Sequence, residues 1–191
     1  MGVAGGHPFF TMRLTGFPPI IDDTSRILIL GSFPSSASLE EGMYYGHRRN
    51  HFWPLIAHIY STSVPINIDE KLALLRSGHL ALWDLVASCE RQGSLDQNIL
   101  EPELNDIGTL LRSYPGIDRI LVNGSLAAEL LYRNIVGHRG TLPAIGSRQT
   151  WESPRGKELT IYRVPSTSPV PTKHFRRLED KLALWKKALF E

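Results

Sequence analysis

The chain has 191 residues, of which 42% are hydrophobic, with one cysteine and a formal net charge of +2 at pH 7. This length suits a single domain with a real core, and the near-balanced charge excludes a protein that coats nucleic acid through a strongly basic surface. A lone thiol excludes an internal disulfide and a cysteine-ligated zinc or iron–sulfur site, and no apolar run is long enough to span a membrane, so we expect a cytoplasmic protein without metal or cofactor.

The first half of the chain predicts a strand, two helices and a second strand. Residues 1–16 are glycine-rich and lack the charged start of a signal peptide, so we expect a loose arm or an edge extension there. The apolar run 26–30 predicts a buried strand. Short helices are expected over 52–60 and 69–77, and a second buried strand over 79–86.

The second half continues the alternation. Pro102 prevents a long helix around it, so a helix is predicted over 103–113 instead. A strand over 117–122 leads through an Asn-Gly turn into a helix over 125–135, with Ser125 as its cap. A short edge strand is expected over 150–153 and the last buried strand over 158–164. A final helix follows, with one apolar stripe formed by Phe175, Leu178, Leu182, Trp185 and Leu189. Strands that alternate with helices predict an α/β fold with helices on both faces of a mainly parallel sheet of at least four strands.

The loop after the first strand carries groups that suit binding of a base. Gly31 allows a ligand to approach the backbone closely, and Ser32 and Phe33 can offer backbone N–H groups to a carbonyl or a phosphate. Asn50 can hold a water molecule through its carbonyl oxygen. The carboxyl end of a strand is where an open α/β sheet places its ligand site.

Aromatic and basic side chains fill the same loop. Tyr44, Tyr45 and Phe52 can stack on a base, and Arg48 and Arg49 can bind phosphates. The alternative interpretation is an ordinary surface loop whose aromatic rings pack onto the sheet.

Two other strand ends carry unusual chemistry. Asp84 ends an apolar strand, where it would act either as an acceptor that reads a base or as an ion-pair partner, for example of Arg91. The segment 165–169 places hydroxyl and N–H groups between two prolines, which suits either a phosphate nest or a rigid exit turn. The basic cluster 173–177 would face either DNA or solvent. The histidines show no metal-ligand spacing.

These segments together resemble the hypoxanthine-DNA glycosylases, a branch of the uracil-DNA glycosylase superfamily. Residues 31–34, 38–39 and 44–53 resemble the first motif of the branch, 82–96 its central block and 165–169 its last motif. Two departures are Ser35, where the branch has glycine, and a last motif that lacks the histidine of the uracil enzymes.

The resemblance implies a three-layer α/β/α sandwich around a four-stranded, mainly parallel sheet, as one glycosylase domain over 1–191. It implies hydrolysis of the N-glycosidic bond of a deaminated base in DNA, hypoxanthine preferred, leaving an abasic site; we expect a monomer. The implied site has Asn50 as catalytic residue, a base-binding set of Gly31, Ser32, Phe33, Pro34, Tyr45, Phe52 (as stacking ring) and Asp84, and backbone-binding Arg49, Ser166, Thr167, Ser168, Pro169 and Lys173.

Two alternatives stay open on the sequence alone. Uracil presents the same edge as hypoxanthine, a carbonyl beside a ring N–H, so a glycosylase that prefers uracil or G/U mismatches fits as well. A nucleic-acid-binding domain without catalysis would also keep the aromatic and basic residues, although it would have no need of Asn50.

Overall fold

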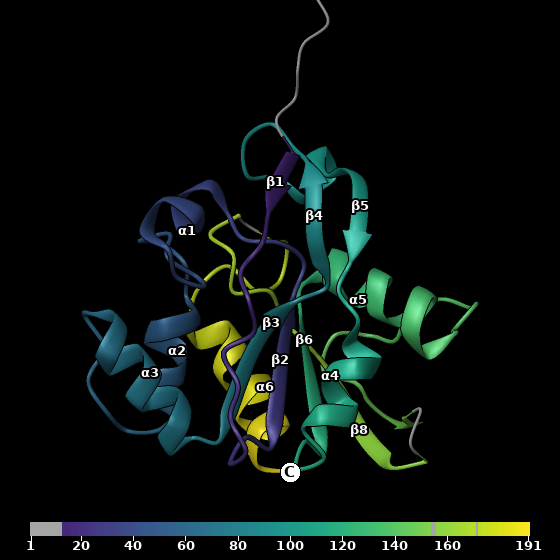
Figure 1. Ribbon diagram of the computed structural model, residues 1–191. Coiled ribbons are helices and arrows are strands. Elements are labelled where there is room, and N and C mark those ends of the chain that lie inside the picture. The colour runs from purple at the N-terminus through teal and green to yellow at the C-terminus, as the bar shows by residue number, and fades with distance from the viewer. Residues whose placement is uncertain (1–12, 154–155, 171) are drawn as a thin grey trace, which may run out of the picture.

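A mixed five-stranded sheet forms the middle layer of the computed structural model, which describes residues 13–153, 156–170 and 172–191 (Figure 1). The strand order is β3-β2-β6-β8-β7, and β3, β2, β6 and β8 run parallel while β7 pairs antiparallel at the edge. The bounds are β2 Ile27–Gly31, β3 Leu80–Asp84, β6 Arg119–Asn123, β7 Arg148–Glu152 and β8 Glu158–Val164. The expected four-stranded sheet is therefore the parallel part of a larger one.

Strand β2 is an interior strand of the sheet, between β3 and β6, and both of its faces are apolar. Ile27 and Ile29 belong to one core cluster, and Leu28 and Leu30 to the cluster on the opposite face of the sheet. All five residues of the strand are buried, as is usual for a parallel strand covered by helices on both sides.

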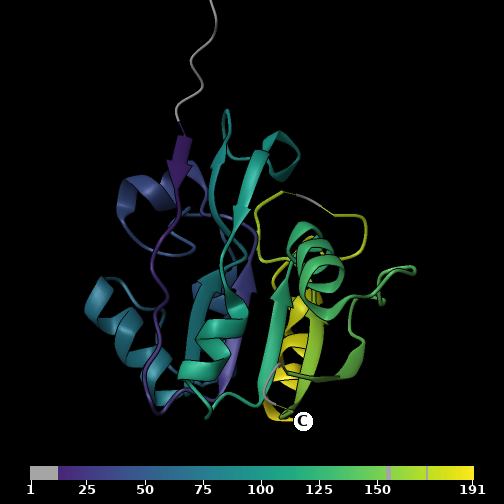
Figure 2. The same ribbon diagram turned by 45° about the vertical axis from the view of Figure 1, so that its right-hand side comes forward.

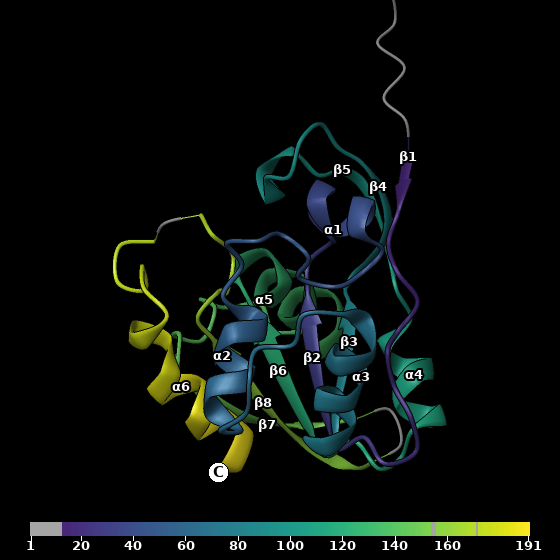
Figure 3. The same ribbon diagram turned by 90° about the vertical axis from the view of Figure 1, so that its left-hand side faces the viewer.

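Helices cover both faces of the sheet (Figures 2 and 3). The first cluster is closed by α2 (Phe52–Ile59), α3 (Ile68–Ser77) and α6 (Glu179–Phe190), and the second by α4 (Ile107–Ser113) and α5 (Ser125–Leu131), which continues as a π-helical turn over Tyr132–Val136. No helix in the described part of the chain is long and apolar enough to cross a bilayer.

A second, three-stranded sheet stands beyond the carboxyl ends of the parallel strands (Figure 1). Its antiparallel order is β1-β4-β5, with bounds β1 Arg13–Thr15, β4 Val86–Glu90 and β5 Leu100–Leu104. Strand β1 lies at the edge of this sheet, while the rest of the segment expected to form a loose arm or an edge extension, residues 1–12, lies outside the described residues. Helix α1 (Ser36–Glu41) and a 3-10 turn (Asp96–Asn98) lie at the same end.

Several predicted elements need correction. The strand expected over 79–86 is two strands, because the chain bends at the buried Leu85 and β4 enters the second sheet. The helix expected over 103–113 begins only at Ile107, where Asp106 caps it by accepting a hydrogen bond from Thr109 N at 2.8 Å. Gly124, and not Ser125, is the N-cap of α5. The helices expected over 52–60 and 69–77 and the strand over 158–164 are confirmed.

Trp185 on α6 is the largest fully buried side chain, and its indole Nε1 donates to the carbonyl of Pro165 at 2.9 Å. Replacement by alanine would leave a cavity in the first core cluster and would leave the Pro165 carbonyl without this donor. We expect Trp185→Ala to lower the free energy of unfolding by about 3–5 kcal/mol in urea denaturation. The control Ile66→Ala, at a side chain that is 86% exposed, should change it by less than about 0.5 kcal/mol; equal effects would contradict this account.

Candidate active site

The polar groups named from the sequence meet at the carboxyl ends of the parallel strands. Gly31 at the end of β2 is the register partner of Asp84 at the end of β3. Asn123 at the end of β6 is likewise paired with Val164, which leads into the last motif. The sheet therefore brings the three predicted strand-end segments to one edge, as the parallel topology requires.

Gly31 and Asp84 lie closer than any residue with a side chain at position 31 would allow. A Cβ on Gly31 would come within 2.4 Å of Asp84 Oδ1 and 3.5 Å of the Tyr45 hydroxyl. The next two residues after β3 fix the arrangement, because Leu85 N donates to the Gly31 carbonyl at 2.9 Å and Val86 N to the Ser32 carbonyl at 3.0 Å. The missing side chain thus makes room for a carboxyl group at the end of the neighbouring strand.

Asp84 is 4% exposed, and its Oδ2 has no hydrogen-bond partner among the described residues. Burial, followed by the charge of Asp96, raises the pKa of Asp84 from its ordinary 3.8 to about 7, against a smaller opposing effect of Arg91. A large share of Asp84 is therefore neutral at physiological pH. A buried carboxyl with a free oxygen at a strand end is a candidate for ligand binding.

Arg91 is not the ion-pair partner of Asp84 that one interpretation of the sequence offered. No salt bridge joins the two side chains in the described part of the chain. Instead Arg91 Nη2 donates to the Pro34 carbonyl at 2.6 Å, and the guanidinium lies 4.9 Å from the centroid of the Phe33 ring. The arginine thus braces the turn that follows β2.

The turn itself contributes backbone groups more than side chains. The N–H groups of Ser32 and Phe33 donate to no acceptor within the described residues. The Ser32 hydroxyl is already engaged, because it donates to Asp96 Oδ1 at 2.7 Å. The Phe33 ring is buried in a small cluster with Val86 and Cys89, so its side chain packs inward.

Tyr45 and Phe52 stack on each other, with ring centroids 4.0 Å apart and an angle of 21° between their planes. Phe52 is fully buried, whereas Tyr45 is half-buried and has a φ of 56°, a backbone conformation that is costly for a residue with a side chain. Phe52, expected from the sequence as the stacking ring, is thus covered by Tyr45, which is the partly exposed ring of this pair.

Asn50 is half-buried directly before α2. Its Oδ1 accepts a hydrogen bond from Phe52 N at 2.9 Å, and its own N–H donates to the His47 carbonyl at 2.7 Å. An amide oxygen can accept two hydrogen bonds, so one site on Oδ1 remains for a water molecule. The bond to Phe52 fixes the direction of the carboxamide.

The last motif is anchored by Thr167, which is 1% exposed. Asn123 Nδ2 donates to the Thr167 hydroxyl at 2.9 Å, and Thr167 N donates to Asn123 Oδ1 at 3.0 Å. The Thr167 carbonyl accepts from His51 N at 2.9 Å, so the loop of Asn50 and the last motif are joined directly. Thr167 is therefore a structural anchor of the predicted backbone-binding segment.

The other predicted backbone-binding residues lie at or near the surface. Ser166, Ser168 and Pro169 are partly exposed, and Ser168 N donates to the Ser166 hydroxyl at 3.2 Å. Arg49 and Lys173 are exposed. Their side chains are thus available to a large ligand such as a nucleic acid.

Ser35 explains one departure from the expected motif. Ser35 is the N-cap of α1 and has an ordinary φ of −66°, and its side chain accepts a hydrogen bond from Ser38 N. No glycine is needed at this point, and the hydroxyl caps the helix instead.

Sequence reasoning missed three residues of the site. Asn123 was interpreted as part of a turn, although its position at a strand end was a usable signal. Lys181 was not considered, yet it lies three residues after Leu178 and four before Trp185, and therefore on the apolar stripe of the last helix. Asp96 lies on the turn between β4 and β5, which was not predicted. No cluster of metal-ligating side chains is found within the described ranges.

Comparison with known proteins gives consistent results. The family model of the uracil DNA glycosylase superfamily matches residues 18–189. A protein of Methanosarcina barkeri named hypoxanthine DNA glycosylase is 36% identical over 119 residues, covering 62% of this chain and 75% of the relative. A Methanosarcina acetivorans protein of the same name is 36% identical over 115 residues, covering 60% and 73%. A solution NMR structure from Methanosarcina acetivorans, described as a candidate uracil DNA glycosylase, is similar with a TM-score of 0.69 and 28% identity, covering 93% of this chain and 97% of that one.

The close approach at the end of β2 makes a prediction for stability. Gly31→Ala should lower the free energy of unfolding by about 1–3 kcal/mol, because its Cβ would collide with the Asp84 carboxyl. In an Asp84→Ala background the same change should cost much less. Urea denaturation of the four proteins of this double-mutant cycle measures the coupling. Additive effects would mean that the two residues do not collide.

Proposed function

The chain belongs to the uracil DNA glycosylase superfamily, and on that premise we propose that it is a DNA glycosylase that hydrolyses the N-glycosidic bond of deaminated bases, with hypoxanthine preferred. The names of its Methanosarcina relatives support this substrate. The observation that carries the proposal is the juxtaposition of Gly31 and Asp84, which places a buried carboxyl beside two free backbone donors.

The target nucleotide must first leave the duplex, because its glycosidic bond cannot be reached inside the helix. The flipped base would stack on Tyr45, whose strained backbone and stacking on Phe52 hold the ring in place. Hypoxanthine offers a carbonyl beside a ring N–H. The N–H groups of Ser32 and Phe33 suit the carbonyl, and the free Oδ2 of Asp84 suits the ring N–H, so adenine would leave both sides unpaired.

Bond cleavage develops positive charge on the sugar and negative charge on the departing base. The backbone donors would stabilise the base. The neutral form of Asp84, which is present in large proportion up to about pH 7, does not repel the departing base, whereas an ionised carboxylate at this position would. Asn50 would hold the attacking water through the unused acceptor site of its Oδ1. Water adds to the sugar carbon and the base leaves with a proton, so the products are the free base and an abasic site.

We further propose that the whole chain, residues 1–191, works as one glycosylase domain and as a monomer. The exposed side chains of Arg49 and Lys173 and the segment 166–169 would bind the DNA backbone around the flipped nucleotide.

Asn50→Ala is the decisive test of the mechanism. It should lower the single-turnover rate of hypoxanthine release from an inosine-containing duplex by at least about a hundredfold, while binding to the same duplex persists. The measurement is a gel assay of alkali-cleaved abasic sites, run in parallel on inosine and uracil substrates. If uracil is released faster than hypoxanthine, the protein is still a DNA glycosylase, but its preferred base is uracil and not hypoxanthine.

A matched control separates catalysis from stabilisation of the helix start, because Asn50 Oδ1 also accepts a hydrogen bond from Phe52 N at the first residue of α2. Asn67 stabilises the start of α3 as its N-cap, where it accepts from Glu70 N at 2.9 Å, and it belongs to none of the segments predicted to form the site. Asn67→Ala should therefore lose about 1 kcal/mol of stability and keep full activity. Wild-type turnover in Asn50→Ala would contradict the role of Asn50.

The pH dependence of excision tests Asp84. Because its pKa is raised to about 7, Asp84 is neutral at lower pH and becomes ionised as the pH rises through that value. We expect the single-turnover rate to fall as the pH rises above about 7, and Asp84→Asn, which stays neutral, to lack this fall. An identical fall in both proteins would show that Asp84 does not act on the departing base.

A further inference from the structure

A buried lysine contacts His51, the residue that joins the loop of Asn50 to the last motif. Lys181 on α6 is 1% exposed, and its Nζ lies 3.0 Å from Nδ1 of His51. Buried lysines normally have a carboxylate partner, yet no salt bridge involves Lys181 among the described residues. The neighbouring Asp180 instead accepts hydrogen bonds from the backbone N–H groups of Arg176 and Arg177.

This contact determines the proton position on His51. An ammonium group can only donate, so Nδ1 of His51 must accept and the proton of the neutral ring must be on Nε2. Burial and then the charge of Lys181 lower the pKa of His51, against a smaller effect of Glu179, so the ring is neutral at pH 7. The Nε2–H has no acceptor among the described residues, and His51 is partly exposed.

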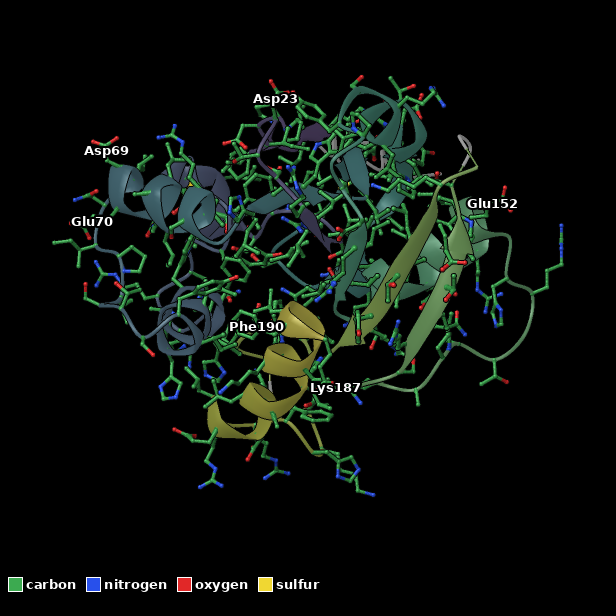
Figure 4. The ribbon with its side chains drawn as sticks, turned by 90° about the horizontal axis from the view of Figure 1, so that it is seen from below. Asp23, Asp69, Glu70, Glu152, Lys187 and Phe190 are labelled. Atoms are coloured by element: carbon green, nitrogen blue, oxygen red, sulfur yellow. The ribbon has the colours of Figure 1, made fainter. Side chains whose placement is uncertain are left out.

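The position of His51 indicates what this donor would bind. The residue follows Asn50, is the N-cap of α2, and donates its backbone N–H to Thr167 of the last motif. A helix N-terminus and a buried cation both favour an anion. Acidic side chains are not confined to one end of the molecule: the view from below labels Asp23, Asp69 and Glu70 (Figure 4), and Glu179 acts on His51.

We propose that His51 donates its Nε2–H to one phosphate of the DNA strand that carries the lesion, and that Lys181 is the positioning residue that fixes the tautomer of His51 and adds positive charge behind it. The proposal rests on DNA being the substrate. It assigns a phosphate-binding role to a neutral histidine, which would bind without the water shell that an exposed lysine keeps.

Binding to uncleavable DNA tests this independently of catalysis. The probe is a duplex with a tetrahydrofuran abasic-site analogue, and fluorescence anisotropy gives its affinity over a range of salt concentrations. We expect Lys181→Met and His51→Leu to bind several-fold more weakly. Lys181→Met should also reduce the slope of log affinity against log salt by up to about 0.9, because it removes one positive charge behind the phosphate that His51 contacts.

Two matched variants sharpen the result. His51→Gln places an amide N–H near the position of Nε2 and should restore much of the affinity lost in His51→Leu. Lys187→Met removes one positive charge from the same helix at the opposite end, where Lys187 pairs with Glu191 at 3.9 Å. It should leave both affinity and slope unchanged. An equal loss in Lys187→Met would mean that only the net charge matters.

Single neutral methylphosphonates placed on either side of the lesion identify the contact. One of them should weaken binding by the wild-type protein and have little further effect on Lys181→Met. An unchanged salt slope in Lys181→Met, with only a shifted melting temperature, would overturn the proposal and leave Lys181 a structural residue. Failure of the wild type to release hypoxanthine would reject the proposed function without bearing on this contact.

Discussion

The absence of a side chain at Gly31 is the constraint on which the site depends. It lets the carboxyl of Asp84 lie against the end of β2, where any Cβ would collide with it. The buried carboxyl then has a raised pKa and, within the described part of the chain, an oxygen without a hydrogen-bond partner, and the turn that follows leaves two backbone donors without acceptors there. One missing methyl group thus creates both the space and the electrostatics of a base-binding slot.

A short chain of hydrogen bonds unites the rest of the site. Asn123 both donates to and accepts from Thr167, and the Thr167 carbonyl accepts from His51 N. Lys181 Nζ in turn donates to His51 Nδ1. These residues come from the end of β6, the last motif, the start of α2 and the last helix. Because each bond is buried or half-buried, the loops that would hold DNA are preorganised by the core and do not rely on the ligand to order them.

The sequence predicted the parts of this molecule that depend on local pattern. Apolar runs identified β2 and β8, helical spacing identified α2 and α3, and the motifs placed Asn50 in the loop before α2 and Asp84 at a strand end. The sequence did not predict the features that depend on tertiary contacts. The second sheet depends on pairing between β1 and β4, which are far apart in the chain. Which of Tyr45 and Phe52 is the more exposed ring depends on which of them packs inward. The partner of Lys181 is 130 residues away along the chain, so no local pattern could have revealed it.

The bend at Leu85 limits where residues can be inserted into or deleted from this chain. A single residue separates β3 from β4, so one strand path serves both sheets and carries Asp84 on one side of the bend and Ser88 on the other. Side chains alternate along a strand, so inserting or deleting one residue here would turn every later side chain of β4 to the opposite face. We therefore expect length changes to be rare in this stretch, whereas the exposed residues 139–141 lie outside the strand pairing and can accept them.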